Sequence, residues 1–127
     1  MILPYSTLIY PPVPVLEVLL SAPAMDDWQG AYTAIIDSGA DITIVPFAIL
    51  QSLNSPVMRP VVLSSQWRDR HSVYIYKVDI QVDRMIFPAV DVAGDPGSGE
   101  ILLGRNVLNR LDLRLEGPAL RTHLPVV

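Results

Sequence analysis

The residues whose types and spacing could do chemistry are Asp37, Ser38 and Gly39, a short polar insert between two apolar runs. Residues 34–36 precede the insert and residues 42–45 follow it, and both runs have the composition of buried strands. A carboxylate in an apolar frame is costly unless it has a partner or a function. Gly39 relieves the backbone where a tight loop must form. We therefore expect Asp37 to carry chemistry, the alternative being a loop residue of an inert barrel.

A second motif, near the other end of the chain, accompanies the first. It reads Ile-Leu-Leu-Gly-Arg-Asn over residues 101–106. Asp-Ser-Gly alone would be weak evidence for any family. With the second motif at this distance in a chain of 127 residues, the sequence resembles the retropepsin-like aspartic proteases, the dimeric relatives of pepsin. The resemblance covers most of the chain, from residue 13 to residue 124.

The resemblance implies an aspartic endopeptidase that acts on a peptide or protein substrate without a cofactor. Peptide hydrolysis then needs a base that activates water and an acid that protonates the substrate. Two carboxyls that share one proton supply both, as aspartic proteases are known to do, because like charges at close range cannot both ionise. This chain has one Asp-Ser-Gly. The implied site therefore contains Asp37 from both chains of a homodimer.

The resemblance also implies a role for each residue of the first loop. Asp37 would be the catalytic carboxyl, and Ser38 would hydrogen-bond to the partner's loop and hold the two Asp37 groups coplanar. Gly39 would expose its carbonyl to the substrate backbone. Ala40 and Asp41 would border the site, and Asp41 would bind the main chain of the peptide.

In the second motif, residues 102–104 would pack beneath the active-site loop, and Leu102 would also contact the substrate. Arg105 would pair with Asp41 or with a residue of the partner chain, and so fix the dimer. Asn106 would tie down the backbone of the loop.

The polar segment at residues 64–72 lies between two expected strands, where the family has its flap. Gln66 and Trp67 would contact the substrate there. Family flaps often carry glycines at the tip, and this segment has none, so the flap would close differently. This departure favours a rival interpretation, in which the chain is a catalytically silent dimerisation or peptide-binding module with the same fold.

The composition argues against several other classes of protein. A formal net charge of −4 and a pI near 4.9 argue against nucleic-acid binding, which needs a basic patch. The chain has no cysteine and two histidines, so we expect no disulfide, no Cys nucleophile and no metal site. No Lys or Arg precedes Arg59, and no apolar run reaches the length of a membrane span. We therefore expect no secretory signal, no membrane contact and a cytoplasmic location.

The elements that must position the two motifs are mostly short strands. The first 14 residues contain four prolines, which predicts an extended arm over residues 1–14 and a protease-like domain over residues 15–127. We expect strands at 15–20, 31–36, 42–45, 61–63, 73–82, 85–92 and 101–103, with a bulge or bend near Lys77. The predicted class is all-β, a small closed barrel-like acid-protease fold with one or two short helices.

The expected helices are at residues 46–53 and 107–111. In the first, Phe47, Leu50 and Leu53 share one face, and Pro46 suits the first turn. A hairpin with its turn at residues 117–118 and a return strand at 119–124 would end the chain.

Several polar residues have a simpler explanation than chemistry. Asp79, Asp83 and Asp91 alternate with apolar neighbours, which predicts solvent-facing strand positions. His123 is expected at the surface, as is the other histidine. Glu100 is a candidate for the wall of a cleft.

Overall fold

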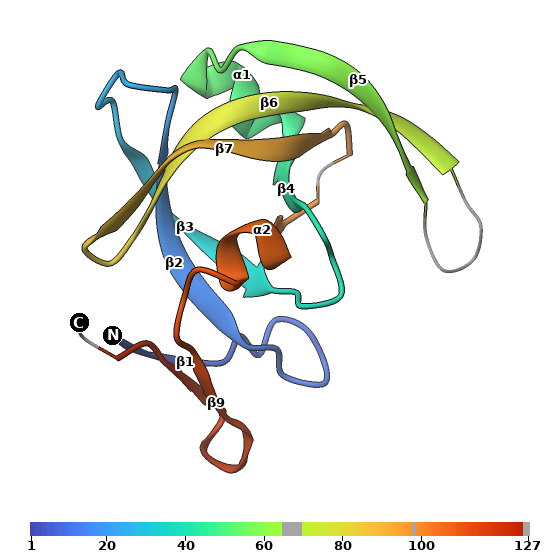
Figure 1. Cartoon of the computed structure of the whole chain (residues 1–127). Helices are drawn as coiled ribbons and strands as arrows, with labels where there is room; N and C mark the ends of the chain where they lie inside the picture. The colour runs from blue at the N-terminus through green and yellow to red at the C-terminus, as the bar shows by residue number, and fades with distance from the viewer. Residues whose placement is uncertain (65–69, 98, 126–127) are drawn as a thin grey trace.

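The chain folds around one strongly curved sheet, shown in a computed structural model that describes residues 1–64, 70–97 and 99–125 (Figure 1). The strands of this sheet are β2 (Val15–Ser21), β3 (Gln29–Ile36), β4 (Thr43–Pro46), β5 (Val57–Ser64), β6 (Arg70–Val82), β7 (Met85–Asp95) and β8 (Ile101–Leu103). They lie in the order β2-β3-β8-β4-β7-β6-β5, and β2 also pairs with β6. This last pairing closes six strands into a barrel, and β5 extends the edge at β6.

Two short helices, α1 (Phe47–Leu53) and α2 (Arg105–Leu108), accompany the barrel. The arrangement confirms the predicted all-β class with a closed barrel and short helices. No helix within the described ranges is long and apolar enough to cross a membrane.

The apolar core fills the inside of the barrel. β2 shows the pattern, because Leu16, Val18 and Leu20 are each 1% exposed whereas Glu17 is exposed. Burial of such side chains is the main favourable term in folding. Other fully buried members of the core come from the remaining strands and from the helices, and include Val45, Leu50, Val78, Ile80, Val82, Val92, Leu103 and Val107.

The hairpin predicted before Asp37 is present. β2 and β3 are antiparallel, with Val15 opposite Ile35. β3 then pairs in parallel with β8, so that Ile35 also lies opposite Leu102. Parallel strands need a long connection, and here it spans everything between the two sequence motifs. The pairing brings the ends of β3 and β8, and with them both motifs, to one place.

The helix predicted at residues 46–53 is confirmed as α1. Pro46 occupies its N-cap position, and Asn54 ends it with a left-handed φ of 54°, a common way for helices to stop. Leu50 and Leu53 are buried as predicted. Phe47 is 44% exposed, so the predicted apolar face is only partly covered.

Some boundaries differ from the predictions. β5 pairs with β6 from Val57 to Ser64, so both strands include polar ends that side-chain patterns do not mark. α2 begins at Arg105 rather than at Val107. The reason is that Gly104 is extended (φ −85°, ψ 178°) and the next residue already turns, which places Val107 in the core.

Asp79 corrects one prediction, because it is 6% exposed rather than solvent-facing. The register of β6 against β7 shifts between Val78 and Ile80, so three consecutive residues are buried and the alternation is interrupted. The Asp79 carboxylate accepts hydrogen bonds from the N–H of Ala24 at 2.9 Å and of Ala89 at 2.8 Å. Each oxygen therefore has a partner, and the carboxylate connects the β2–β3 turn to β7.

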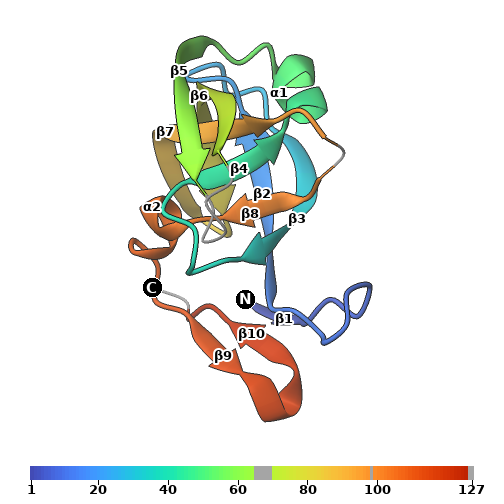
Figure 2. The same cartoon turned by 90° about the vertical axis from the view of Figure 1, so that its right-hand side faces the viewer.

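A second sheet, here called the small sheet, joins the two ends of the chain. It consists of β1 (Ile2–Pro4), β10 (Arg121–His123) and β9 (Arg114–Glu116), in that order. The Met1 ammonium donates to the Leu124 carbonyl at 2.8 Å. The predicted C-terminal hairpin is thus present, with a 3-10 turn, η1 (Gly117–Ala119), at its tip. Figure 2 shows the small sheet at the foot of the barrel.

Glu116 lies at the centre of the charges of the small sheet. Arg121 donates a hydrogen bond to its carboxylate, while Arg114 and His123 lie 3.8 and 3.9 Å from it. The hydrogen bond from Arg121, followed by the positive charge of Arg121 and its neighbours, lowers the pKa of Glu116 below its ordinary value.

We predict that Glu116→Gln destabilises the protein at neutral pH but not in strong acid. A carboxyl whose pKa is lowered by folding stabilises the protein fully above the ordinary glutamate pKa of about 4.3, and this contribution is lost as the pH falls through the lowered pKa. Thermal unfolding of both proteins from neutral pH downwards measures the effect. The two midpoints should converge in acid, and a gap that stays constant would contradict the role of the charge. Glu17→Gln, at an exposed glutamate of β2 with no ion pair to a described residue, is the matched control.

Candidate active site

The loop that follows β3 holds Asp37 at the mouth of the barrel. The Asp37 N–H donates to the Leu103 carbonyl at 3.0 Å, which continues the parallel pairing by one residue. The Asp37 carbonyl accepts from the Ala40 N–H at 3.2 Å, and its Oδ1 accepts from the Gly39 N–H at 3.0 Å. The side chain of Asp37 is half-buried, whereas Ser38 and Gly39 are exposed. The backbone thus fixes the direction of a carboxylate that solvent can still reach.

Gly104 lies beneath this loop in a space that admits only glycine. A Cβ atom there would lie 2.6 Å from the Ile42 carbonyl oxygen and 2.8 Å from the Thr43 nitrogen. Both are backbone atoms that a side-chain movement cannot clear. The next residue, Arg105, adds a hydrogen bond to the loop, because its N–H donates to the Ala40 carbonyl at 2.8 Å. The end of β8 and the Asp37 loop are therefore in direct backbone contact.

Asn106 ties three segments together. Its Oδ1 accepts from the N–H of Thr43 at 3.0 Å and from the Thr43 hydroxyl at 2.8 Å. Its Nδ2 donates to the Asp91 carbonyl of β7 at 2.8 Å. The Thr43 hydroxyl in turn accepts from the Gly104 N–H at 3.1 Å. In this network both the N–H and the hydroxyl of the buried Thr43 have partners.

Sequence reasoning did not single out Thr43 as part of the site. It is the one polar residue in the run 42–45 and is fully buried. A buried hydroxyl in a strand needs a partner, so its position inside an apolar run was the available signal.

Arg105 binds a backbone carbonyl rather than a carboxylate within the chain. Its Nη1 donates to the Ser38 carbonyl at 2.8 Å, and no ion pair joins it to Asp41 among the described residues. The predicted pair of Arg105 with Asp41 is therefore absent from the single chain, because the guanidinium supports the loop at Ser38. The predicted alternative, a contact of Arg105 with the partner chain, stays a prediction.

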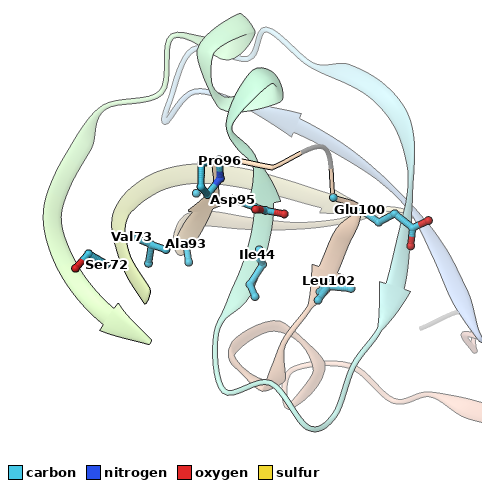
Figure 3. A pocket seen from close by; sticks show the side chains of 10 residues that line it. Ile44, Ser72, Val73, Ala93, Asp95, Pro96, Glu100 and Leu102 are labelled. Carbon is cyan, nitrogen blue, oxygen red and sulfur yellow. The ribbon is translucent and has the colours of Figure 1, made fainter. Parts of the chain in front are cut away.

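A cavity of about 610 Å³ lies beside the loop, at the end of the barrel where β4, β7 and β8 meet (Figure 3). Leu102 lines it, as does Ile44, which pairs with Leu102 across β4 and β8. Glu100 also lines this cavity, in agreement with its assignment to a cleft wall. Gln66 and Trp67, expected in the flap, lie outside the described residues.

The arrangement offers the half-buried, solvent-accessible carboxyl of Asp37 in a loop held by backbone hydrogen bonds, next to a largely apolar cavity. A carboxylate in such a position can hold and activate a water molecule or exchange a proton with a ligand. Within the described ranges, no group of three His, Cys, Asp or Glu side chains could hold a metal ion.

We predict that Gly104→Ala disrupts the Asp37 loop. The new Cβ would overlap the backbone at residues 42 and 43, and overpacking of this kind costs about 1–3 kcal/mol, or more where backbone must move. Urea unfolding measures the loss of free energy. Gly117→Ala is the matched control, because a Cβ at Gly117 meets nothing within 4 Å and should change stability by less than about 0.5 kcal/mol. Equal stability of the two variants would contradict the close contact at Gly104.

Comparisons with known proteins agree with this geometry. No protein-family model matches the sequence, and no curated protein matches it. Among solved structures, a retropepsin-like aspartic protease from Rickettsia conorii matches with a TM-score of 0.61 and 11% identity, covering 99% of this chain and 92% of that one. The EIAV protease in complex with the inhibitor HBY-793 matches with a TM-score of 0.56 and 19% identity, over 83% and 93% of the two chains. The simian foamy virus (mac) protease matches with a TM-score of 0.52 and 24% identity, over 75% and 91%. The chain therefore has the retropepsin-like fold.

Proposed function

We propose that the protein is an aspartic endopeptidase whose catalytic carboxyl is Asp37. The observation that carries this proposal is the geometry of the Asp37 loop. Its carboxylate is half-buried and oriented by the Gly39 N–H, and the loop rests on a glycine that leaves no space for any other residue. The likeness of the fold to retroviral-type aspartic proteases supports the same chemistry.

Catalysis would use two copies of Asp37 in a homodimer. One carboxylate acts as the base that takes a proton from water, and the other, protonated, gives its proton to the substrate. Because one carboxyl must be ionised and the other protonated, the dependence of rate on pH should be bell-shaped with an acidic optimum. Ser38, which is exposed in this loop, would hydrogen-bond to the loop of the partner chain.

The small sheet is our candidate for the main contact between the two chains. Ile2 and Leu115 on its strands are 59% and 51% exposed, and Leu120 beside it is 46% exposed. Exposed apolar side chains favour burial against another surface, although the register places Ile2 and Leu115 on opposite faces of the small sheet. A mean hydropathy of +0.36 for a chain of this size points the same way.

The substrate would be an extended peptide that binds by main-chain hydrogen bonds, as strands do. Apolar side chains of the peptide would flank the scissile bond. A silent peptide-binding module remains the other reading of this fold, and the experiment below decides between the two.

We predict that Asp37→Asn abolishes cleavage and leaves the fold intact. Asparagine keeps an oxygen in the place of the Oδ1 that binds Gly39, but it cannot act as the acid or the base of the pair. Digestion of a peptide library at mildly acidic pH, with products mapped by mass spectrometry, should show a loss of at least about a thousandfold. The thermal midpoint should change by no more than about 2 °C.

The control is Asp83→Asn, which removes the same charge at an exposed turn between β6 and β7. Cleavage by this variant should match that of the wild type and should be inhibited by pepstatin. Full activity of Asp37→Asn would rule out the assignment. A wild-type protein that binds peptides but cleaves none of them would establish the silent module.

We predict that specific activity falls as the protein is diluted, because each chain supplies one carboxyl and dimers dissociate. Leu115→Arg should move this fall to higher protein concentrations, since it places a charge on the small sheet. Met25→Arg is the control, at an apolar residue 68% exposed in the β2–β3 turn. Sedimentation velocity measures the dimer directly. Activity that does not depend on concentration, from a protein that sediments as a monomer, would remove the shared site.

A further inference from the structure

The cavity beside the Asp37 loop has two chemically different parts. Ile44, Val73, Ala93 and Leu102 give it an apolar wall, and the carboxylate of Asp95 lies at one edge. Figure 3 shows the apolar side chains in one row across the strands, with Asp95 in a second row above them, next to β4. A volume of about 610 Å³ is enough for a large side chain.

Asp95 is held in a fixed orientation at the end of β7. Its Oδ1 accepts from the Gly97 N–H at 2.9 Å. Its Oδ2 lies so close to Gly99 that a Cβ there would collide with it. The Gly97 N–H therefore positions the carboxylate, and the absence of a side chain at Gly99 leaves the space that its Oδ2 occupies.

Asp95 has no cationic partner within the described part of the chain. The ion pairs there involve Asp91 and Glu116 as the acids. Glu100, which lines the same cavity, also forms none of these pairs. In Figure 3 its side chain points toward β3, so it adds negative charge to the far rim without facing Asp95. The cavity thus carries negative charge that the described residues do not neutralise.

We propose that this cavity binds a lysine or arginine side chain of the peptide substrate, with its cation at the Asp95 carboxylate. The proposal rests on the proposed function, since it names a side chain of the substrate for the same site. The long aliphatic stem of lysine or arginine would lie on Ile44 and Leu102, and its charged end would reach the edge of the cavity. A purely apolar side chain satisfies the wall and leaves the carboxylate without a cationic partner, so the two-part lining favours a basic residue.

Peptide binding tests the proposal without relying on cleavage. The probes are labelled octapeptides made of leucine, phenylalanine and alanine with one lysine, which is placed at each position in turn. Each lysine peptide has a matched twin with norleucine at that position, because norleucine has the lysine side chain without its amino group. Binding to the full-length Asp37→Asn protein is measured by fluorescence anisotropy near neutral pH, where carboxylates are ionised. At one position the lysine peptide should bind at least about fivefold more tightly than its twin.

Three further substitutions, one of them a control, assign the effect. Adding Asp95→Asn should remove most of the difference between the twins, and Glu100→Gln should remove a smaller part. Adding Asp83→Asn, which changes the net charge equally at the opposite end of the β6–β7 hairpin, should leave the difference in place. The difference should also shrink as salt is added.

The proposal is overturned if no position prefers lysine, if no peptide binds, or if the preference survives Asp95→Asn. Digestion of the same peptides by the wild-type protein separates this proposal from the proposed function. Cleavage without a basic preference keeps the endopeptidase and removes the proposed pocket. A lysine preference in binding, without any cleavage by the wild type, keeps the pocket and removes the endopeptidase.

Discussion

The site depends on one contact, in which the backbone at Gly104 lies directly against the backbone at residues 42 and 43. The space beside the Gly104 Cα holds a hydrogen atom but no Cβ, which would lie 2.6 Å from the Ile42 carbonyl oxygen. Thr43 and Asn106 then satisfy the polar atoms that the contact buries. A contact between backbone atoms cannot be relieved by a change of side-chain rotamer. It therefore fixes the position of the Asp37 loop relative to β8 more firmly than side-chain contacts would. The same contact explains why a polar insert can sit at the mouth of an apolar barrel without loosening it.

Features set by local pattern could be predicted from the sequence. The hairpin before Asp37, helix α1 and the return of the chain after Gly117 follow from alternation, from Pro46 and from turn residues. Both motifs could also be placed in one site, through their joint resemblance to a known family. Features set by the pairing of distant strands could not. Asp79 is buried because a register shift in β6 turns it inward; the bulge or bend predicted near Lys77 indicated an irregularity in this strand, but not that it would bury Asp79. Arg105 binds the Ser38 carbonyl because two loops meet there, whereas charge alone favoured Asp41.

The distribution of charge divides the molecule. The described ion pairs gather on the small sheet and on the outer strands β5 to β7, where they join acids to bases. Around the cavity, by contrast, Asp95 and Glu100 have no such partners among the described residues. Unpaired charge at a concave surface is a cost to the isolated protein that a ligand of opposite charge can recover. Exposed acids elsewhere, such as Glu17, are also without ion pairs to described residues, so the feature that sets Asp95 apart is the cavity that it lines.

The parallel pairing of β3 with β8 also has a consequence for the order in which the protein forms during synthesis. Asp37 leaves the ribosome before the groups that hold its loop, because the Leu103 carbonyl and the Arg105 N–H follow more than sixty residues later. Contacts between such distant residues form late, because the chain between them must first be ordered. A nascent chain in which Asp-Ser-Gly has been synthesised therefore still lacks the oriented Asp37 carboxylate. The loop reaches its final geometry only when nearly the whole barrel has closed.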